Sequence, residues 1–324
     1  MKTVKFHILY PILFFACIAC NTQDDVKTST DPVPPTEGLK TKNVIIVVID
    51  GPRCSETWGE QTRQYIPKQA NEMLQHVVFF PNFRNGGPTY TTSGHTAIMT
   101  GNYQNIDNSG SELPNYPSMM QYWREKYNVD STKAWVIASK DKLEVLADCK
   151  HPEWLGRHKP STNCGINGLG TGYRPDITTY QRTLELLSEH HPRLALINFR
   201  EPDYSAHAND WDGYINGISN TDEYVYRLWN FIKSDSFYKG NTALFITNDH
   251  GRHLDGISNG YISHGDGCGG CRHITLYAYG PDFKKDHTVD TECEQIDISA
   301  TIAKLLDFEM PTAQGRVLDE LFAQ

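Results

Sequence analysis

The sequence predicts an α/β protein with a doubly wound, mostly parallel central sheet and helices on both faces. Six short runs rich in β-branched residues are almost continuously apolar, as strands buried on both faces of a parallel sheet are. Most of these runs are separated by stretches with apolar residues at three- and four-residue spacing, which is typical of amphipathic helices. A chain of 324 residues is long enough for one large domain with a sizeable core.

The expected elements follow one another along the body of the chain, residues 43–324. Strands are expected at residues 44–49, 77–80, 134–138, 194–199, 243–247 and 274–279. Helices are expected at residues 116–127, 177–190, 222–232 and 296–306, and a further helix begins within residues 94–99. Residues 148–175 are rich in Gly, Pro, His and Asn without a period, so they are expected to form a loop-rich insertion.

The N-terminus reads as an export signal rather than as part of the domain. Two lysines precede an apolar run at residues 6–19 that is too short for a permanent membrane span. Ala19 before Cys20 resembles a bacterial lipobox, although Cys17 stands where Leu is usual. We therefore expect a lipoprotein signal at residues 1–19, against ordinary cleavage or an uncleaved anchor. The polar, Pro-rich residues 20–42 are expected to form a flexible tether.

This reading predicts an exported protein, anchored through lipidated Cys20 in the periplasm or at the outer-membrane surface of a Gram-negative bacterium. The net charge is −9, and no basic stripe indicates a nucleic-acid surface. Six cysteines follow Cys20, and in an oxidising compartment they suggest up to three disulfides with fifteen alternative pairings. Cys149 with Cys164, and Cys268 with Cys271, would each close a short loop. The oligomeric state is left open.

Potential metal ligands stand where the expected strands end. Ligands of parallel α/β sheets bind outside the carboxyl ends of the strands, and oxygen and nitrogen donors there suit zinc. The pairs Asp50-Gly51 and Asp249-His250 come directly after two strands, and Asp203 and His207 follow a third. His264 and His273 precede the last strand. Each of these motifs alone has an ordinary structural explanation, such as a turn or a pair on a helix surface. Because three strand ends of one sheet carry such ligands, a metal site is the better explanation.

A run of hydroxyl residues precedes the expected helix at residues 94–99. The run is "GGPTYTTSGHTAIMTG", Gly86 to Gly101. A hydroxyl at this point lies where the N–H groups of a helix attract an anion. The alternative is an ordinary Thr/Ser N-cap.

Together these motifs resemble the alkaline phosphatase superfamily, nearest to its type I phosphodiesterase/nucleotide pyrophosphatase and Thr-nucleophile phosphatase branches. "VVIDG" resembles the first strand and metal-binding Asp of the family, and "PTYTTSGHTAIMTG" its nucleophile pattern, in which the second Thr falls on Thr91. "EPDYSAH" resembles the D-x-x-x-H pair and "TNDHG" the D-H-G pair. The closing segment "QIDISATIAKLLDFEMPTAQGRVLDELF" also fits, so the resemblance covers nearly the whole chain after the tether.

The resemblance implies a hydrolase of phosphate esters that uses two divalent ions, usually zinc. Thr91 would attack phosphorus and form a phosphothreonine, which water then hydrolyses. The implied ligands of one ion are Asp50, Thr91, Asp249 and His250. Those of the other are Asp203, His207 and a third histidine, either His264 or His273.

Several points stay open at this level. An Asn that contacts the phosphoryl group would be Asn105, Asn108 or Asn115, and Arg53, Arg84 or Arg252 could grip a second oxygen. Monoesters and diesters are both compatible, as are small-molecule and head-group substrates, whereas the sulfatase motif is absent around Thr91. Cys268, Cys271, His264 and His273 could instead bind a structural zinc. The alternatives in function are a non-catalytic or substrate-capture lipoprotein on the same fold, and a phosphoryl- or sulfuryl-transfer member of the superfamily.

Overall fold

The computed structural model describes Met1 and residues 38–323. Within this part of the chain, the strands are β1 (Asn43–Asp50), β2 (Val78–Arg84), β3 (Ala134–Ala138), β4 (Ser161–Cys164), β5 (Leu194–Pro202), β6 (Thr242–Asn248), β7 (His273–Tyr279), β8 (His287–Thr288) and β9 (Cys293–Glu294). The α-helices are α1 (Thr91–Thr100), α2 (Met119–Tyr127), α3 (Asp176–His190), α4 (Asp203–His207), α5 (Trp211–Ser234), α6 (Gly269–Arg272) and α7 (Asp297–Leu305).

The central sheet is mostly parallel, as the sequence predicts. Its order is β4-β3-β5-β1-β6-β7-β2-β8, and β9 pairs with β2. From β4 to β6 every neighbouring pair is parallel, whereas β7 runs antiparallel to both β6 and β2. The link between β6 and β7 holds only short helical turns, so β7 returns beside β6 without the crossover that a parallel pair requires.

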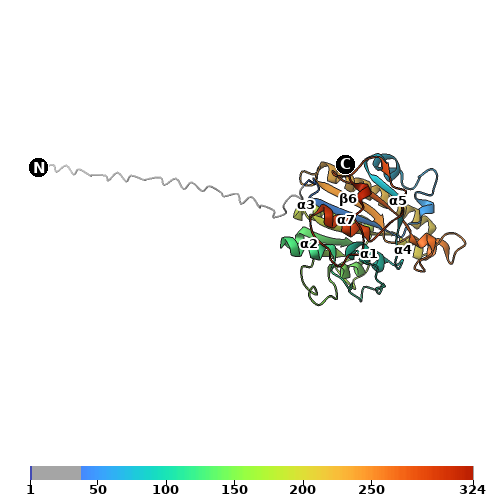
Figure 1. Ribbon diagram of the computed structural model, residues 1–324, viewed down its shortest axis with the longest axis horizontal. Helices are drawn as coiled ribbons and strands as arrows, with labels where there is room; N and C mark the ends of the chain where they lie inside the picture. The colour runs from blue at the N-terminus through green and yellow to red at the C-terminus, as the bar shows by residue number, and fades with distance from the viewer. Residues whose placement is uncertain (2–37, 324) are drawn as a thin grey trace. The chain divides into compact units, whose positions relative to one another are not determined.

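Two apolar layers pack on the two faces of the sheet. In β1, successive side chains point to opposite faces: Val44, Ile46 and Val48 join one cluster, and Ile45, Val47 and Ile49 join the other. The first cluster includes residues of α1, α2 and α7, and the second includes residues of α3 and α5. Helices therefore cover both faces, which confirms the predicted fold class (Figure 1).

Local signals explain where the helices begin. Ser118 and Gln121 form a reciprocal capping box at the start of α2, three residues later than expected from the pattern. Asp210 caps α5 by accepting a hydrogen bond from Gly213 N at 2.9 Å. This helix begins at Trp211, well before the predicted residues 222–232, because the polar residues of its first turns mask the apolar period.

The loop-rich segment 148–175 contains one strand, β4, that its sequence pattern does not predict. β4 is four residues long, polar and half-exposed, and it pairs in parallel with the edge of β3. An edge strand of this kind is stabilised by backbone pairing to its neighbour, so neither apolar alternation nor a continuous apolar run marks it.

The predicted tether ends earlier than residue 42. Lys40 and Thr41 donate backbone hydrogen bonds to the Asp282 carboxylate at 2.9 and 2.8 Å, and the Thr41 side chain is buried. The remainder of the tether up to residue 37, Cys20 and, apart from Met1, the predicted signal at residues 1–19 lie outside the described residues. None of the helices in the part that the structure describes is long and apolar enough to cross a membrane.

Candidate active site

The carboxyl ends of three adjacent parallel strands carry the predicted acidic ligands. Asp50 is the last residue of β1, Asp203 directly follows β5, and Asp249 directly follows β6. Because β1 lies between β5 and β6, the three carboxylates meet at one edge of the sheet. Gly51 turns the chain sharply with φ +63°, and a Cβ there would lie 3.0 Å from the His250 ring.

Asp50, Asp249 and His250 form a first cluster of donor atoms. One ligand atom from each lies within 4.8 Å of the others. His250 Nε2 is 3.3 Å from Asp249 Oδ2 and 3.6 Å from Asp50 Oδ1. Both Asp249 Oδ2 and His250 Nε2 are buried without a hydrogen-bond partner among the described residues, which costs about 1–3 kcal/mol for each atom. Unpaired donors that converge on one point fit a divalent cation.

The pKa shifts in this cluster also favour the binding of a cation between its carboxylates. Burial and the neighbouring Asp50 raise the pKa of the Asp249 carboxyl well above its usual range. Burial lowers the pKa of His250 well below its usual range, so its imidazole is neutral and can act as a metal ligand. A bound cation would relieve the repulsion between the two carboxylates.

Asp203, His207 and His264 form a second cluster. Ligand atoms of Asp203, His250 and His264 lie within 4.8 Å of one another. His207 Nε2 is 3.2 Å from Asp203 Oδ1 and 3.0 Å from His264 Nε2. The Nδ1 of His264 is 2.7 Å from the Thr89 carbonyl oxygen, which turns Nε2 toward the cluster. The structure therefore brings together Asp203, His207 and His264, as predicted.

His273 is not a member of either cluster, so its assignment as a metal ligand is wrong. It is the first residue of β7, which pairs antiparallel with β2. Its Nε2 lies 2.7 Å from the Pro81 carbonyl oxygen of that neighbouring strand. The antiparallel pairing thus directs this ring along the sheet toward β2 and leaves His264 as the third histidine.

Lys140 is a buried residue of the site that the sequence analysis missed. Its Nζ is 2.8 Å from Asp50 Oδ2, 2.6 Å from Asp203 Oδ2 and 3.2 Å from Thr91 Oγ1. Burial opposes its charge, but Asp203 and Asp50 outweigh burial and raise the pKa of Lys140 above its usual value. Lys140 follows β3, the neighbour of β5, so the rule that located the carboxylates could also have found it.

Arg252 is the second cation of this site. Its guanidinium is fully buried and pairs with Asp203 Oδ1. Burial alone would raise the pKa of Asp203, but Lys140, His207, His264 and Arg252 lower it well below its usual range. The Asp203 carboxylate is therefore ionised and already bound by two positively charged side chains.

Thr91, the predicted nucleophile, is the first residue of α1 and opens into a large cavity. Its Oγ1 is 3.5 Å from Asp50 Oδ1, and the partial positive charge of the helix N-terminus lies beside it. The cavity has a volume of about 540 Å³. It is lined by Thr91, Asn108, Lys140, Lys142, Tyr173, Asp203, Tyr204, His207 and Ala208.

Two buried side chains hold the Thr91 turn in place. Asn198 Nδ2 lies 3.3 Å from Asp50 Oδ2 and 3.2 Å from His95 Nε2, while His95 Nδ1 lies 2.8 Å from the Thr91 carbonyl oxygen. Burial lowers the pKa of His95 to about 3, so the ring is neutral. The amide donates to Nε2, so the proton sits on Nδ1 and is donated to the Thr91 carbonyl.

Of the three candidate asparagines, Asn108 is the one that lines the cavity together with Thr91. Its Oδ1 accepts hydrogen bonds of 3.0 Å from Thr92 N and from Lys142 Nζ, and the residue lines the cavity. Neither Asn105 nor Asn115 lines that cavity. Burial and the nearby Lys140 lower the pKa of Lys142 to about 8. Asn108 and Lys142 therefore form a hydrogen-bonded pair in the cavity wall near Thr91.

Other sequence-based alternatives do not reach the site. Arg53 pairs with Glu56 at 2.6 Å, and Arg84 pairs with Glu292 at 3.3 Å, so neither faces the cavity. The six cysteines in the described part of the chain are free thiols, so the proposed disulfides are wrong. Cys268 and Cys271 do lie with a histidine, but it is His253 rather than His264 or His273.

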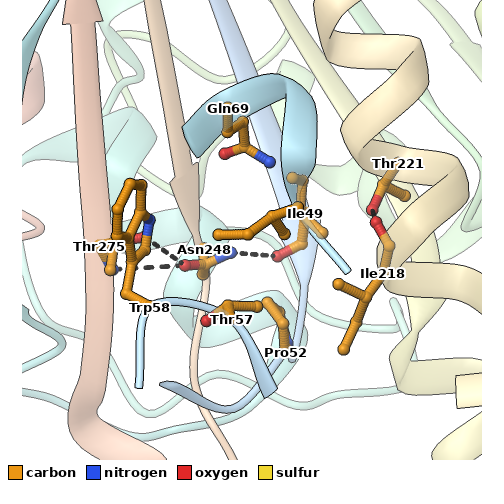
Figure 2. Close-up of a pocket in the computed structure, with 10 residues that line it drawn as sticks. Ile49, Pro52, Thr57, Trp58, Gln69, Ile218, Thr221, Asn248 and Thr275 are labelled. Carbon is orange, nitrogen blue, oxygen red and sulfur yellow. Dashed lines mark hydrogen bonds between the residues drawn. The ribbon is translucent and has the colours of Figure 1, made fainter. Parts of the chain in front are cut away.

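A second, much smaller cavity lies behind the strand ends (Figure 2). Its volume is about 20 Å³, which is room for about one water molecule. At its edge, Asn248 donates to the Ile49 carbonyl oxygen at 3.1 Å and accepts from Thr275 N at 3.3 Å (Figure 2). These bonds tie β1, β6 and β7 together immediately before Asp50 and Asp249.

Solved structures of known proteins share this fold. A protein of the alkaline phosphatase superfamily from Vibrio parahaemolyticus superposes with a TM-score of 0.66 at 16% identity, covering 90% of this chain and 72% of its own. The phosphonate monoester hydrolase of Agrobacterium radiobacter superposes with a TM-score of 0.62 at 14% identity, and the match covers 86% of this chain and 76% of that protein. Murine ectonucleotide pyrophosphatase/phosphodiesterase 5 superposes with a TM-score of 0.59 at 14% identity, and the match covers 87% of this chain and 100% of that protein. No curated protein matches the chain in sequence.

These structures share the fold of the chain, and the two donor clusters lie at the carboxyl ends of its parallel strands, where α/β sheets bind ligands. The profile of the type I phosphodiesterase / nucleotide pyrophosphatase family matches residues 44–253, well over half of the sequence. The chain belongs to this family. It is a phosphoric ester hydrolase, and its sheet edge presents the clustered donors that a metal-dependent member requires.

Proposed function

We propose that the chain hydrolyses phosphodiesters through a phosphothreonine at Thr91, with two divalent ions, zinc being the expected metal. The position of Thr91 carries this proposal: its hydroxyl lies at a helix N-terminus, 3.2 Å from Lys140 Nζ, and opens into the cavity. A volume of about 540 Å³ accommodates more than a phosphate group, which supports an ester with two substituents. Tyr173 and Tyr204 also line the cavity.

The residues around Thr91 prepare its oxygen for attack. Lys140 donates a hydrogen bond to Oγ1 and stabilises negative charge there, while Asp50 lies within reach of the proton. As Oγ1 gives its proton to Asp50 and bonds to phosphorus, the opposite P–O bond breaks, and the leaving alkoxide takes up this proton and departs as the first alcohol. A water molecule then attacks phosphorus, the bond to Oγ1 breaks, one proton of the water returns to Oγ1, and a phosphate monoester is released. Asn108 and Lys142 are placed to bind the non-bridging oxygens.

The two donor clusters would hold the ions with unequal affinity. Asp50, Thr91, Asp249 and His250 would bind one ion, and Asp203, His207 and His264 the other. Such ions lower the pKa of a bound hydroxyl and neutralise the charge of the leaving oxygen. In the first cluster, Asp249 Oδ2 and His250 Nε2 are unpaired and Asp50 binds one cation, Lys140, whereas Asp203 binds both Lys140 and Arg252. A second ion has to compete with these cations, so we expect it to bind more weakly.

Two ester substrates test this function. The chain is expected to hydrolyse bis-p-nitrophenyl phosphate faster than p-nitrophenyl phosphate, to lose both activities on chelation and to regain them with zinc. Initial rates at matched concentrations give the ratio. Inertness toward both esters, with the ions bound, would instead support the substrate-capture alternative. Formation of an alkyl phosphate in the presence of added alcohol, in excess of hydrolysis, would support the transferase alternative.

We also propose that the protein is exported and anchored through a lipid on Cys20. This rests on the signal-like residues 1–19 and on the Cys20 position, both read from the sequence. Cys20→Ser is expected to abolish incorporation of radiolabelled palmitate and to release the protein from the membrane fraction. The control is Cys17→Ser, which should label normally. Labelling that persists in Cys20→Ser would contradict the anchor.

A further inference from the structure

A second group of metal-binding side chains lies outside the active site. It consists of His253, Asp266, Cys268 and Cys271, and one donor atom from each lies within 4.8 Å of the others. A tetrahedral zinc ion with sulfur, nitrogen and oxygen ligands holds its donor atoms about 3.3 to 3.8 Å apart. His253 Nε2 and Asp266 Oδ2 are 3.1 Å apart, close to such an edge. The geometry of the group is therefore compact enough for one ion.

The buried imidazole of His253 points into this group, with Nε2 lying 3.1 Å from Asp266 Oδ2. The residue is only 4% exposed, and its Nε2 is buried without a hydrogen bond among the described residues, despite the nearby Asp266 oxygen. The His253 imidazole and the Asp266 carboxylate are therefore close enough to bind the same ion. On the other side of the ring, His253 Nδ1 lies 3.1 Å from Ser263 Oγ, which fixes its orientation.

The two thiols are presented by a tight turn that packs against the His253 segment. A Cβ on Gly270 would lie 2.4 Å from the Arg252 carbonyl oxygen, so only glycine permits this approach. Gly251 N donates to the Cys271 carbonyl at 2.8 Å, and Cys268 N donates to Asp266 Oδ1 at 2.9 Å. Backbone contacts therefore place the Cys-x-x-Cys turn beside His253 and orient the carboxylate.

We propose that His253, Asp266, Cys268 and Cys271 bind a structural zinc ion. Two thiolates, an imidazole and a carboxylate are ligands that zinc accepts in closed four-coordinate sites, and sulfur donors disfavour calcium and magnesium. The ion joins the segment after Asp249-His250 to the loop at residues 263–268, which carries His264. Its role is to fix the position of His264 in the active site. This role does not depend on which ester the chain hydrolyses.

Cobalt substitution tests the site without measuring activity. The purified full chain loaded with Co²⁺ is expected to show a thiolate-to-cobalt charge-transfer band in the near ultraviolet. The active-site donors include no sulfur, so this band reports only cysteine ligation. Cys268→Ser with Cys271→Ser should abolish it, and His253→Ala should weaken and shift it. Cys54→Ser, which changes a free thiol elsewhere, and Asp249→Asn, which disrupts the active-site cluster, should both retain it.

The chain purified without reductant provides the second measurement. Peptide mass spectrometry is expected to find Cys268 and Cys271 as free thiols, and elemental analysis of the wild type to find one more zinc per chain than in the double serine variant. A disulfide between the two cysteines, or absence of the charge-transfer band from the wild type, would overturn the proposal. Because both of these readouts use the wild type, they stand even if the double variant fails to fold.

Discussion

Replacing Thr91 with alanine is expected to lower kcat for both nitrophenyl esters by about a thousandfold or more. Loss of a covalent nucleophile removes the first chemical step, and comparable losses in other hydrolases reach several orders of magnitude. Zinc content should stay close to that of the wild type, because Asp50, Asp249 and His250 retain their donor atoms. Stopped-flow or steady-state rates and elemental analysis of the same preparation give both quantities.

Two matched variants make the result specific. Thr91→Ser keeps the hydroxyl and should retain measurable turnover and a phosphorylated-residue intermediate in quenched reactions. The adjacent Thr92→Ala removes a hydroxyl that bonds to Asn108 at 3.0 Å, so it should change substrate affinity more than the chemical step. If Thr91→Ala remained active while Thr92→Ala was inert, the nucleophile would have to be reassigned to Thr92.

Lys140→Met is expected to destabilise the metal-free chain by about 3–5 kcal/mol, the usual cost of removing one partner from a buried ion pair. The substitution leaves Asp50 and Asp203 buried and without the ammonium that lies 2.8 and 2.6 Å from them. Zinc should restore most of the stability and bind to the second cluster more tightly than in the wild type. Urea unfolding with and without zinc, together with calorimetric zinc titration, measures both effects.

Lys142→Met is the matched control for this substitution. Lys142 is also largely buried, but its hydrogen-bond partner is the neutral Asn108 amide oxygen, at 3.0 Å. Burial lowers the pKa of Lys142 to about 8, so its charge opposes folding below that pH and its removal should cost little stability. Equal destabilisation by the two substitutions, or no zinc dependence for Lys140→Met, would show that Lys140 does not compete with a metal ion.

Residues that stand directly at strand ends could be recognised from the sequence. Asp50 and the Asp249-His250 pair each follow an apolar run, and Asp203 and His207 occupy one turn of α4. The hydroxyl-rich turn before α1 could be recognised in the same way, but Thr91 within it was assigned from the resemblance of "PTYTTSGHTAIMTG" to a family pattern. The positions of the carboxylates needed only local order along the chain and the rule that parallel strands end at a common edge, whereas their roles came from the family resemblance.

The remaining site residues depend on contacts between segments far apart in sequence. Lys140 enters the site because β3 lies beside β5 and delivers its ammonium between two carboxylates of other strands. The sequence offers both His264 and His273 as the histidine that joins Asp203 and His207. The antiparallel pairing of β2 with β7 is what brings His273 to the Pro81 carbonyl oxygen instead. The partners of Cys268 and Cys271 likewise follow from how one turn packs on another.

The amino-acid sequence by itself determined the fold class and the edge of the sheet where Asp50, Asp203, Asp249 and Thr91 come together. Periodic burial and strand ends are local properties, so the order of residues is sufficient to show them. Only the tertiary structure decided which histidine joins the second cluster, that Lys140 and Arg252 share Asp203, and which thiols lie beside His253. These are pairings of side chains across separate elements, and their distances exist only once the sheet and its loops have packed.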